Sequence, residues 1–256
     1  MRTDTWPQTS ERAARRQSPL LPPAARPAAA VIGVLCVAAT LVMIVLFWHG
    51  TGPSWADSVV DGAVHRVLPW ARRRPLRDIA DLGNPAWVIV LTAVLAAGCL
   101  VLGRFRAAVL AAVSVPAAAA VTELLKPVVD RRLSGAPGYP SGVSFPSGHA
   151  SGLFSLAAVL CVLVMTQAPR MRRAVRLLIA LAAFLVAAAV AVAVIALYRH
   201  YFTDTVAAAA ISIAVVLCVA YIVDLPRWRA GPAGVIAWPG AARRLASPRG
   251  PGGHPD

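Results

Sequence analysis

Six long apolar runs limit the folds open to this chain of 256 residues. The runs occupy residues 28–48, 86–103, 107–125, 150–165, 174–197 and 204–223. About 20 apolar residues in a helix are enough to cross the hydrocarbon core of a bilayer. Hydrophobic residues make up 58% of the chain, which is above the share usual in soluble domains. The sequence therefore predicts an all-α integral membrane protein with six transmembrane helices.

The connections between the runs are short, so we expect a single membrane domain over residues 28–225. The flanking segments, residues 1–27 and 226–256, are basic and rich in Pro and Arg. Such a composition buries too little apolar surface to offset the entropy lost on ordering. We therefore expect both flanks to be disordered.

Arginine supplies nearly all of the positive charge, with 24 Arg, one Lys and a net charge of +14. The arginines are spread over short loops instead of gathering with aromatic residues, so we do not expect nucleic-acid binding. If both termini are cytoplasmic, 16 of the 25 Lys and Arg fall in cytoplasmic segments. The positive-inside rule thus predicts a multi-pass protein of the cell membrane with both termini in the cytoplasm.

Ionisable residues cluster at those ends of the runs that this topology places outside the cytoplasm. The cluster consists of Glu123, Lys126, Asp130, Arg131, Arg132, His149, Arg199, His200 and Asp204. Ionisable groups in membrane helices are functional candidates because they are costly to bury. Cations and two histidines from separate loops have the composition of an anion-binding site, which we expect at the extracytoplasmic face.

The stretch SFPSGHASG opens the fourth run. Pro146 fixes the backbone before the helix, and Ser147 is a suitable N-cap. Gly148 permits close approach of a ligand, and amides at a helix N-terminus bind phosphate. His149 is then placed to give a proton to the leaving oxygen of a phosphate ester. The alternative is an ordinary capped helix start with an interfacial histidine.

The stretch LYRHYFTDTVA leads into the sixth run. His200 and Asp204 are four residues apart, which on a helix places them on one face within hydrogen-bonding reach. A carboxylate on one imidazole nitrogen fixes the tautomer and makes the other nitrogen more nucleophilic. Alternatively, Asp204 only caps the following helix, and Lys126 only snorkels to the interface.

Lys126, Pro-Ser-Gly-His at 146–149 and His-x3-Asp at 200–204 together resemble the signature of the type 2 phosphatidic acid phosphatase superfamily of membrane lipid phosphatases. The likeness covers about residues 54–223 and implies a phosphatidic acid phosphatase type 2-like helical bundle. It also implies that His200 attacks phosphorus to give a phosphohistidine, that Asp204 orients His200, and that His149 protonates the leaving group.

The same resemblance assigns the phosphate oxygens to Lys126, Ser147 and Gly148. It implies no metal and no other cofactor. The cysteines, at positions 36, 99, 161 and 218, all fall within apolar runs, which argues against a disulfide framework or a cysteine metal site.

The chain departs from the family signature after Lys126. Where the family has Arg-Pro, this sequence has Leu133 and Ser134. We expect Arg131 to take the role of the missing arginine, with Arg132 as the next candidate.

A second departure precedes the nucleophile, where the family's Ser-Arg is replaced by Ala193 and Val194. Arg199 is the only nearby substitute. Because consecutive helical residues do not share a face, Arg199 and His200 can reach one phosphate only if the chain is non-helical there.

The resemblance favours an integral membrane phosphatase that hydrolyses a lipid phosphate or a polyprenyl pyrophosphate, such as undecaprenyl pyrophosphate, at the extracytoplasmic face. Its partners would be the lipid substrate and the bilayer, and no sequence feature indicates a protein partner. One alternative is a lipid phosphotransferase that uses the same histidine. Another is an inactive relative that binds anionic lipid.

Overall fold

The structure, a computed structural model, describes residues 19–68, 73–134, 142–168 and 170–225. These ranges form the helices η1 (Pro23–Ala25), α2 (Arg26–Phe47), α3 (Trp55–Val67), α4 (Arg73–Asp81), α5 (Pro85–Val101), α6 (Phe105–Val129), α7 (Gly148–Gln167), α8 (Arg173–Ala196) and α9 (Phe202–Val223). The only β-type pairings in the described ranges are isolated bridges of Arg132 with Thr51 and Val143. The predicted all-α class is therefore confirmed.

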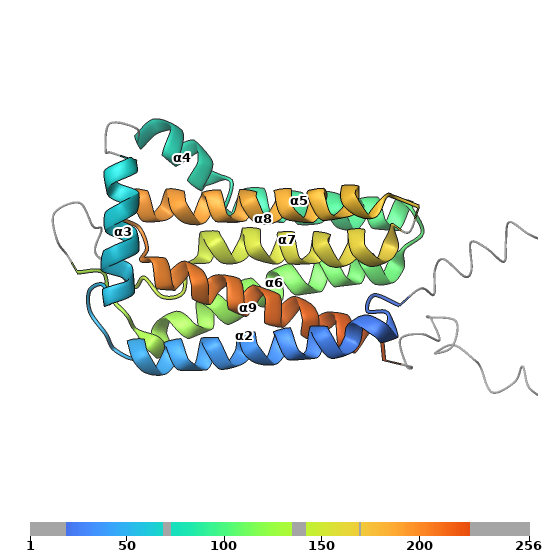
Figure 1. Ribbon diagram of the computed structural model, residues 1–256, viewed down its shortest axis with the longest axis horizontal. Helices are drawn as coiled ribbons and strands as arrows, with labels where there is room; N and C mark the ends of the chain where they lie inside the picture. Colours follow the sequence, from blue (N-terminus) through green and yellow to red (C-terminus); the bar gives the residue numbers. More distant parts are fainter. Residues whose placement is uncertain (1–18, 69–72, 135–141, 169, 226–256) are drawn as a thin grey trace, which may run out of the picture.

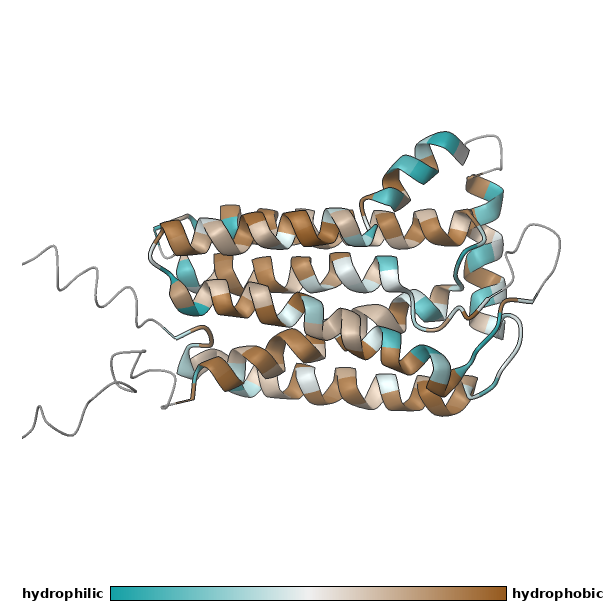
Figure 2. Cartoon of the chain, turned by 180° about the vertical axis from the view of Figure 1, so that it is seen from behind, coloured by the Kyte–Doolittle hydropathy of each residue, from teal (hydrophilic) through white to brown (hydrophobic). Residues whose placement is uncertain are grey.

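The helices α2, α5, α6, α7, α8 and α9 lie side by side along one axis (Figure 1), and each overlaps one of the six predicted spans. Five spans, namely η1 with α2, then α6, α7, α8 and α9, are each long and apolar enough to cross a membrane. Helix α5 has only 17 residues and qualifies only together with α4, across a bend of 44°. Apolar residues dominate the length of the bundle, whereas α3 and α4 are largely hydrophilic (Figure 2). A bundle of five or six membrane-spanning helices results.

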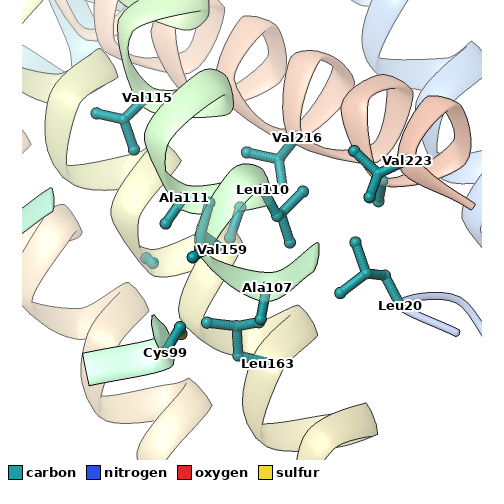
Figure 3. Packing of buried hydrophobic residues seen from close by; sticks show 14 of the residues in the cluster. Leu20, Cys99, Ala107, Leu110, Ala111, Val115, Val159, Leu163, Val216 and Val223 are labelled. Carbon is teal, nitrogen blue, oxygen red and sulfur yellow. The ribbon is translucent and has the colours of Figure 1, made fainter. Parts of the chain in front are cut away.

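Small residues fill the centre of the bundle. Alanines are buried on four helices, at Ala107, Ala111, Ala118, Ala157, Ala158, Ala187, Ala207 and Ala208. Small side chains let membrane helices approach closely, so that dispersion contacts hold the bundle together. Leu110, Val159 and Val216 are fully buried between these helices (Figure 3).

Helix α3 lies across one end of the bundle, and α4 lies beside it (Figure 1). We call this the α3 end. The N-termini of α7 and α9 and the C-terminus of α6 meet there (Figure 1). An N-cap and capping box start α3, since Ser54 Oγ accepts from the amide of Asp57 and the Asp57 carboxylate accepts from the amide of Ser54. Leu76 and Ala80 of α4 are buried against the end of α8.

At the opposite end, the first described residues are folded, contrary to the disorder expected for residues 1–27. Leu20 and Leu21 are buried, and their amides donate to the Asp224 carboxylate at 2.9 and 2.8 Å. Arg106 forms a buried ion pair with the same carboxylate. A charged anchor and two apolar side chains thus order residues 19–27, while the rest of the predicted flanks, 1–18 and 226–256, lies outside the described residues.

Close packing of α5 against α7 depends on Gly152. A Cβ atom at this position would lie 2.7 Å from Cγ2 of Val88, so one of the two helices would have to shift. We expect Gly152→Ala to lower the free energy of unfolding by about 1–3 kcal/mol. Thermal unfolding of the detergent-solubilised protein measures this change.

Gly98 on α5 is the matched control, because a Cβ atom there would meet nothing within 4 Å. Gly98→Ala should leave the melting temperature unchanged or raise it slightly, owing to the better helix propensity of Ala. Combining Gly152→Ala with Val88→Ala should recover part of the loss. Equal melting temperatures for the two single variants would contradict the close α5–α7 contact.

Candidate active site

His200 lies in the non-helical turn between α8 and α9 at the α3 end. Its Nδ1 atom is 2.8 Å from the backbone carbonyl oxygen of Ser144. A carbonyl oxygen only accepts hydrogen bonds, so Nδ1 carries the proton and the Nε2 lone pair is available. The side chain is 12% exposed. The ring is therefore held in the tautomer that a nucleophilic imidazole requires.

Asp204 does not form the hydrogen bond to His200 that the sequence spacing predicts. The distance from His200 Nδ1 to Asp204 Oδ2 is 3.9 Å. Asp204 Oδ2 instead accepts from the amide of Tyr201 at 2.9 Å. Helix α9 begins at Phe202, so His200 precedes the helix and the two residues do not share a helical face. Asp204 caps α9, and the Ser144 carbonyl orients the ring.

Arg131 is buried, with 1% of its side chain exposed. Nη1 donates to Asp204 Oδ1 at 2.7 Å, and Nη2 donates to Asp57 Oδ2 at 2.7 Å. The guanidinium also lies over the rings of Phe47 and Tyr201, at 3.9 and 4.6 Å from their centroids. Its charge is thus already paired with two carboxylates. This location conflicts with the phosphate-binding role that we expected for Arg131.

Arg132 lies at the surface. Its side chain is 60% exposed and pairs with Asp130 at 3.0 Å. Its backbone is held by hydrogen bonds with Gly50 and Gly52, which join the loop after α2 to the loop after α6. Both arginines are therefore paired with carboxylates of the protein itself.

The Pro-Ser-Gly-His stretch forms the predicted capped start of α7. Ser147 is the N-cap, and its Oγ accepts from the amide of Ala150 at 3.4 Å. The amide of Ser147 donates to the carbonyl oxygen of Asp204 at 3.2 Å, which ties the start of α7 to α9. Gly148 and His149 occupy the first turn, where a helix has no acceptor of its own for the amides.

Lys126 lies beside this first turn. Its Nζ is 2.6 Å from Glu123 Oε1, and its side chain is 28% exposed. A Cβ atom on Gly148 would lie 3.7 Å from Lys126 Nζ and 3.5 Å from Glu123 Oε1. Both are ordinary van der Waals distances, so the lysine and its carboxylate lie directly against the start of α7.

The pKa of His200 indicates which charged groups act on its ring. Burial lowers the pKa of His200 to about 4, against the opposing effect of the hydrogen bond to Ser144. The charges of His149, Lys126 and Arg199 lower this pKa further. Residues 197–201 are non-helical, and Tyr198 has a φ of 59°, which is the condition that the sequence set for Arg199 to act beside His200. The charges of His149, Lys126 and Arg199 thus all act on His200.

Sequence reasoning missed the contributions of α3 and of the bend before α5. Asp57 and Asp61 of α3 are buried against the start of α9. A Cβ atom on Gly83, in the bend, would come within 2.8 Å of the His149 backbone. The amphipathic pattern of residues 55–67, with two acids four residues apart, is the signal that could have revealed α3.

An apolar cleft of about 510 Å³ runs between α2 and α9. Its lining includes Ala29 and Gly33 from the first half of α2 and Leu217 and Tyr221 from the second half of α9, and these halves lie towards the end opposite α3 (Figure 1). It is therefore separate from the polar site around His200. Among the described residues, no group of three or more His, Cys, Asp or Glu is arranged to hold a metal ion.

The fold and site define a class: a multi-pass membrane helical bundle with a histidine and cations gathered at one end. The family model of the PAP2 superfamily matches residues 87–228, more than half of the chain, so the protein belongs to the PAP2 superfamily. A structural relative is the first transmembrane PAP2 type phosphatidylglycerolphosphate phosphatase from Bacillus subtilis, with a TM-score of 0.59 and 18% identity over 74% of this chain and 94% of that one. No curated protein matches the sequence.

Arg131 and Arg132 should respond differently to substitution. Arg131→Ala leaves the buried Asp57 and Asp204 without their cation, which we expect to cost about 3–5 kcal/mol of stability. Arg132→Ala removes only an exposed pair and should cost less than about 1 kcal/mol. Thermal unfolding in detergent compares the two. Equal losses would show that Arg131 is not the buried partner of these carboxylates.

The lowered pKa of His200 predicts the acid limit of any reaction in which its neutral ring attacks. The ring should stay neutral down to about pH 4, whereas an ordinary histidine protonates near pH 6.5. The value of kcat/KM should therefore fall with a midpoint near pH 4, once the ionisation of the lipid phosphate, titrated separately by ³¹P NMR, is taken into account. A midpoint at 6.5 that the substrate does not explain would contradict the buried, neutral ring.

Proposed function

We propose that the protein is a membrane lipid phosphatase that hydrolyses a lipid phosphate or polyprenyl pyrophosphate through a phosphohistidine at His200. The observation that carries this proposal is the hydrogen bond from His200 Nδ1 to the Ser144 carbonyl. This hydrogen bond leaves Nε2 unprotonated. The positive charges of Lys126 and Arg199 act on the ring and lower its pKa. Membership of the PAP2 superfamily supports the same proposal.

In the first step, His200 Nε2 attacks phosphorus, and the bond from phosphorus to the leaving oxygen breaks. His149 gives its proton to that oxygen, so the lipid alcohol, or the lipid monophosphate if the substrate is a pyrophosphate, departs neutralised. In the second step, His149 takes a proton from water, and the resulting hydroxide attacks phosphorus. The bond from phosphorus to Nε2 breaks, which releases phosphate and restores the free histidine.

The charge that develops on the phosphoryl oxygens needs fixed donors around it. Lys126 Nζ and the first-turn amides of α7, at Gly148 and His149, supply such donors on one side. Arg199, adjacent to His200, supplies the second cation that the family places elsewhere in the sequence. Ser147 contributes by capping α7, which fixes the direction of these amides.

The site lies at the α3 end of the bundle, beside the hydrophilic residues of α3 and α4 (Figure 2). A lipid can therefore keep its tail in the bilayer while its phosphate reaches His200. The distribution of Arg and Lys supports an extracytoplasmic position for this end, with both termini in the cytoplasm.

The direct test is phosphate release by the detergent-purified protein in the presence of a chelator. The substrates are phosphatidate, phosphatidylglycerol phosphate and a polyprenyl pyrophosphate. We expect release by the wild type and a loss of at least about 1,000-fold in His200→Ala. With ³²P-labelled substrate and an alkaline quench, the label should remain on the wild type and be absent from the variant.

His49→Ala is the matched control, because this exposed histidine lies near the same end and its closest acidic partner, Asp130, is 3.9 Å away. It should keep wild-type turnover. Label on the protein without free phosphate, recovered instead on an added lipid alcohol, would indicate a phosphotransferase. Lipid binding without turnover in either form would indicate an inactive relative, and loss of activity with the chelator would contradict a metal-independent reaction.

A further inference from the structure

Helix α3 lies outside the part of the chain that matches the PAP2 family model, yet it packs against the start of α9. Asp57 and Asp61 lie one turn apart on its inner face, with 0% and 4% of their surfaces exposed. Trp55 and Val59 on the same helix are 82% and 51% exposed. Helix α3 therefore turns its two carboxylates towards the bundle, together with Val64, which packs against the end of α8.

Three carboxylates hold three consecutive backbone amides at the start of α9. Asp204 Oδ2 accepts from Tyr201 at 2.9 Å, Asp61 Oδ1 accepts from Phe202 at 3.1 Å, and Asp57 Oδ1 accepts from Thr203 at 2.8 Å. These amides follow His200 directly in the chain. The positive end of the α9 dipole favours such acceptors. The backbone next to the nucleophile is thus fixed by α3.

The charges of these three carboxylates are not balanced. Within the part of the chain that the structure describes, the ion pairs of Arg131 are those with Asp57 and Asp204. Asp61 Oδ2 is buried and has no hydrogen-bond partner among the described residues. Burial, followed by the charge of Asp57, raises the pKa of Asp61 to about 7, and Asp204 adds to this rise.

Among the described residues, none forms an ion pair with Asp61, and only the amide of Phe202 and the charge of Arg131 partly offset its charge. Helix α3 also carries His65, whose Nε2 is hydrogen-bonded to the carbonyl oxygen of Ile195 and whose ring stacks on Tyr198. The end of α8 that packs here is apolar, with Val194, Ala196 and Leu197 buried. Arg131 lies nearest of the cations and is shared between the other two carboxylates, while Arg199 belongs to the turn of His200.

We infer that Asp61, together with Asp57, is a positioning residue for His200, and that it performs this role in its protonated form. Both anchors of the His200 turn support this inference, which rests on the proposed phosphohistidine function. On one side, Ser144 accepts from His200 and donates its own amide to the carbonyl of Arg131 at 2.8 Å. On the other side, α3 holds the amides that follow. Movement of α3 would therefore displace the ring from the phosphate.

Ionisation of Asp61 would place three negative charges around one arginine. Because the folded-state pKa lies above the ordinary value of 3.8, the folded protein loses stability as the pH rises from about 4 to 7. The contact between α3 and α9 should weaken as Asp61 ionises in the folded protein, which occurs near pH 7. We therefore expect turnover to fall on the alkaline side with a midpoint near pH 7.

The experiment measures kcat and KM between pH 5 and 9 for the full-length protein in detergent, using the best substrate of the panel above. Asp61→Asn keeps an oxygen acceptor for Phe202 and cannot ionise, so its kcat should match the wild type at pH 6 and persist above pH 8. Asp61→Leu removes the acceptor and should lower kcat roughly 10-fold to 100-fold at every pH, with little change in KM. Asp78→Asn, on the exposed face of α4, is the control and should follow the wild-type profile.

Melting temperatures recorded over the same pH range complete the design. Asp61→Asn should be more stable than the wild type above pH 7 and equal to it near pH 4. The inference would be overturned, and the proposed function would stand, if turnover depends on His200 but falls at the same alkaline pH in the wild type and in Asp61→Asn. A wild type that releases no phosphate from any lipid would overturn both.

Discussion

The buried guanidinium of Arg131 is the interaction on which the rest of the site depends. It pairs with Asp57 from α3 and Asp204 from α9 and lies against the rings of Phe47 and Tyr201. A charge in such a place is stable only when partners satisfy it, since desolvation is expensive. Arg131 therefore joins α2, α3, the segment after α6 and α9 at one point, and its backbone carbonyl also holds Ser144.

The residues that support the backbone of the site differ from those that we propose to contact the substrate. The buried carboxylates and Arg131 hold the backbone on either side of His200, while the charges of Lys126 and Arg199 act on its ring. Gly83 permits the close approach of the bend before α5 to α7, because a side chain there would collide with His149. The bundle below supplies rigidity through small, closely packed side chains.

Much of the fold and part of the site could be predicted. Apolar runs gave the six helical segments because spanning helices must satisfy their backbone internally. The Ser147 cap followed from local chemistry, and Arg199 met its requirement of a non-helical turn. The predicted bond between His200 and Asp204 was wrong because the helix begins after His200. Residues 19–27 are folded because Asp224, about 200 positions away in the chain, binds their amides.

The sequence by itself determined the membrane class, the all-α bundle and the residues that carry the family signature, because these follow from local composition and spacing. Only the tertiary structure decided which arginine pairs with the buried carboxylates. Arg131 and Arg132 are neighbours in the chain, yet one is buried between two carboxylates and the other is exposed. The choice depends on Asp57 and Asp204, which lie more than 70 positions away from Arg131, so no local pattern reports it.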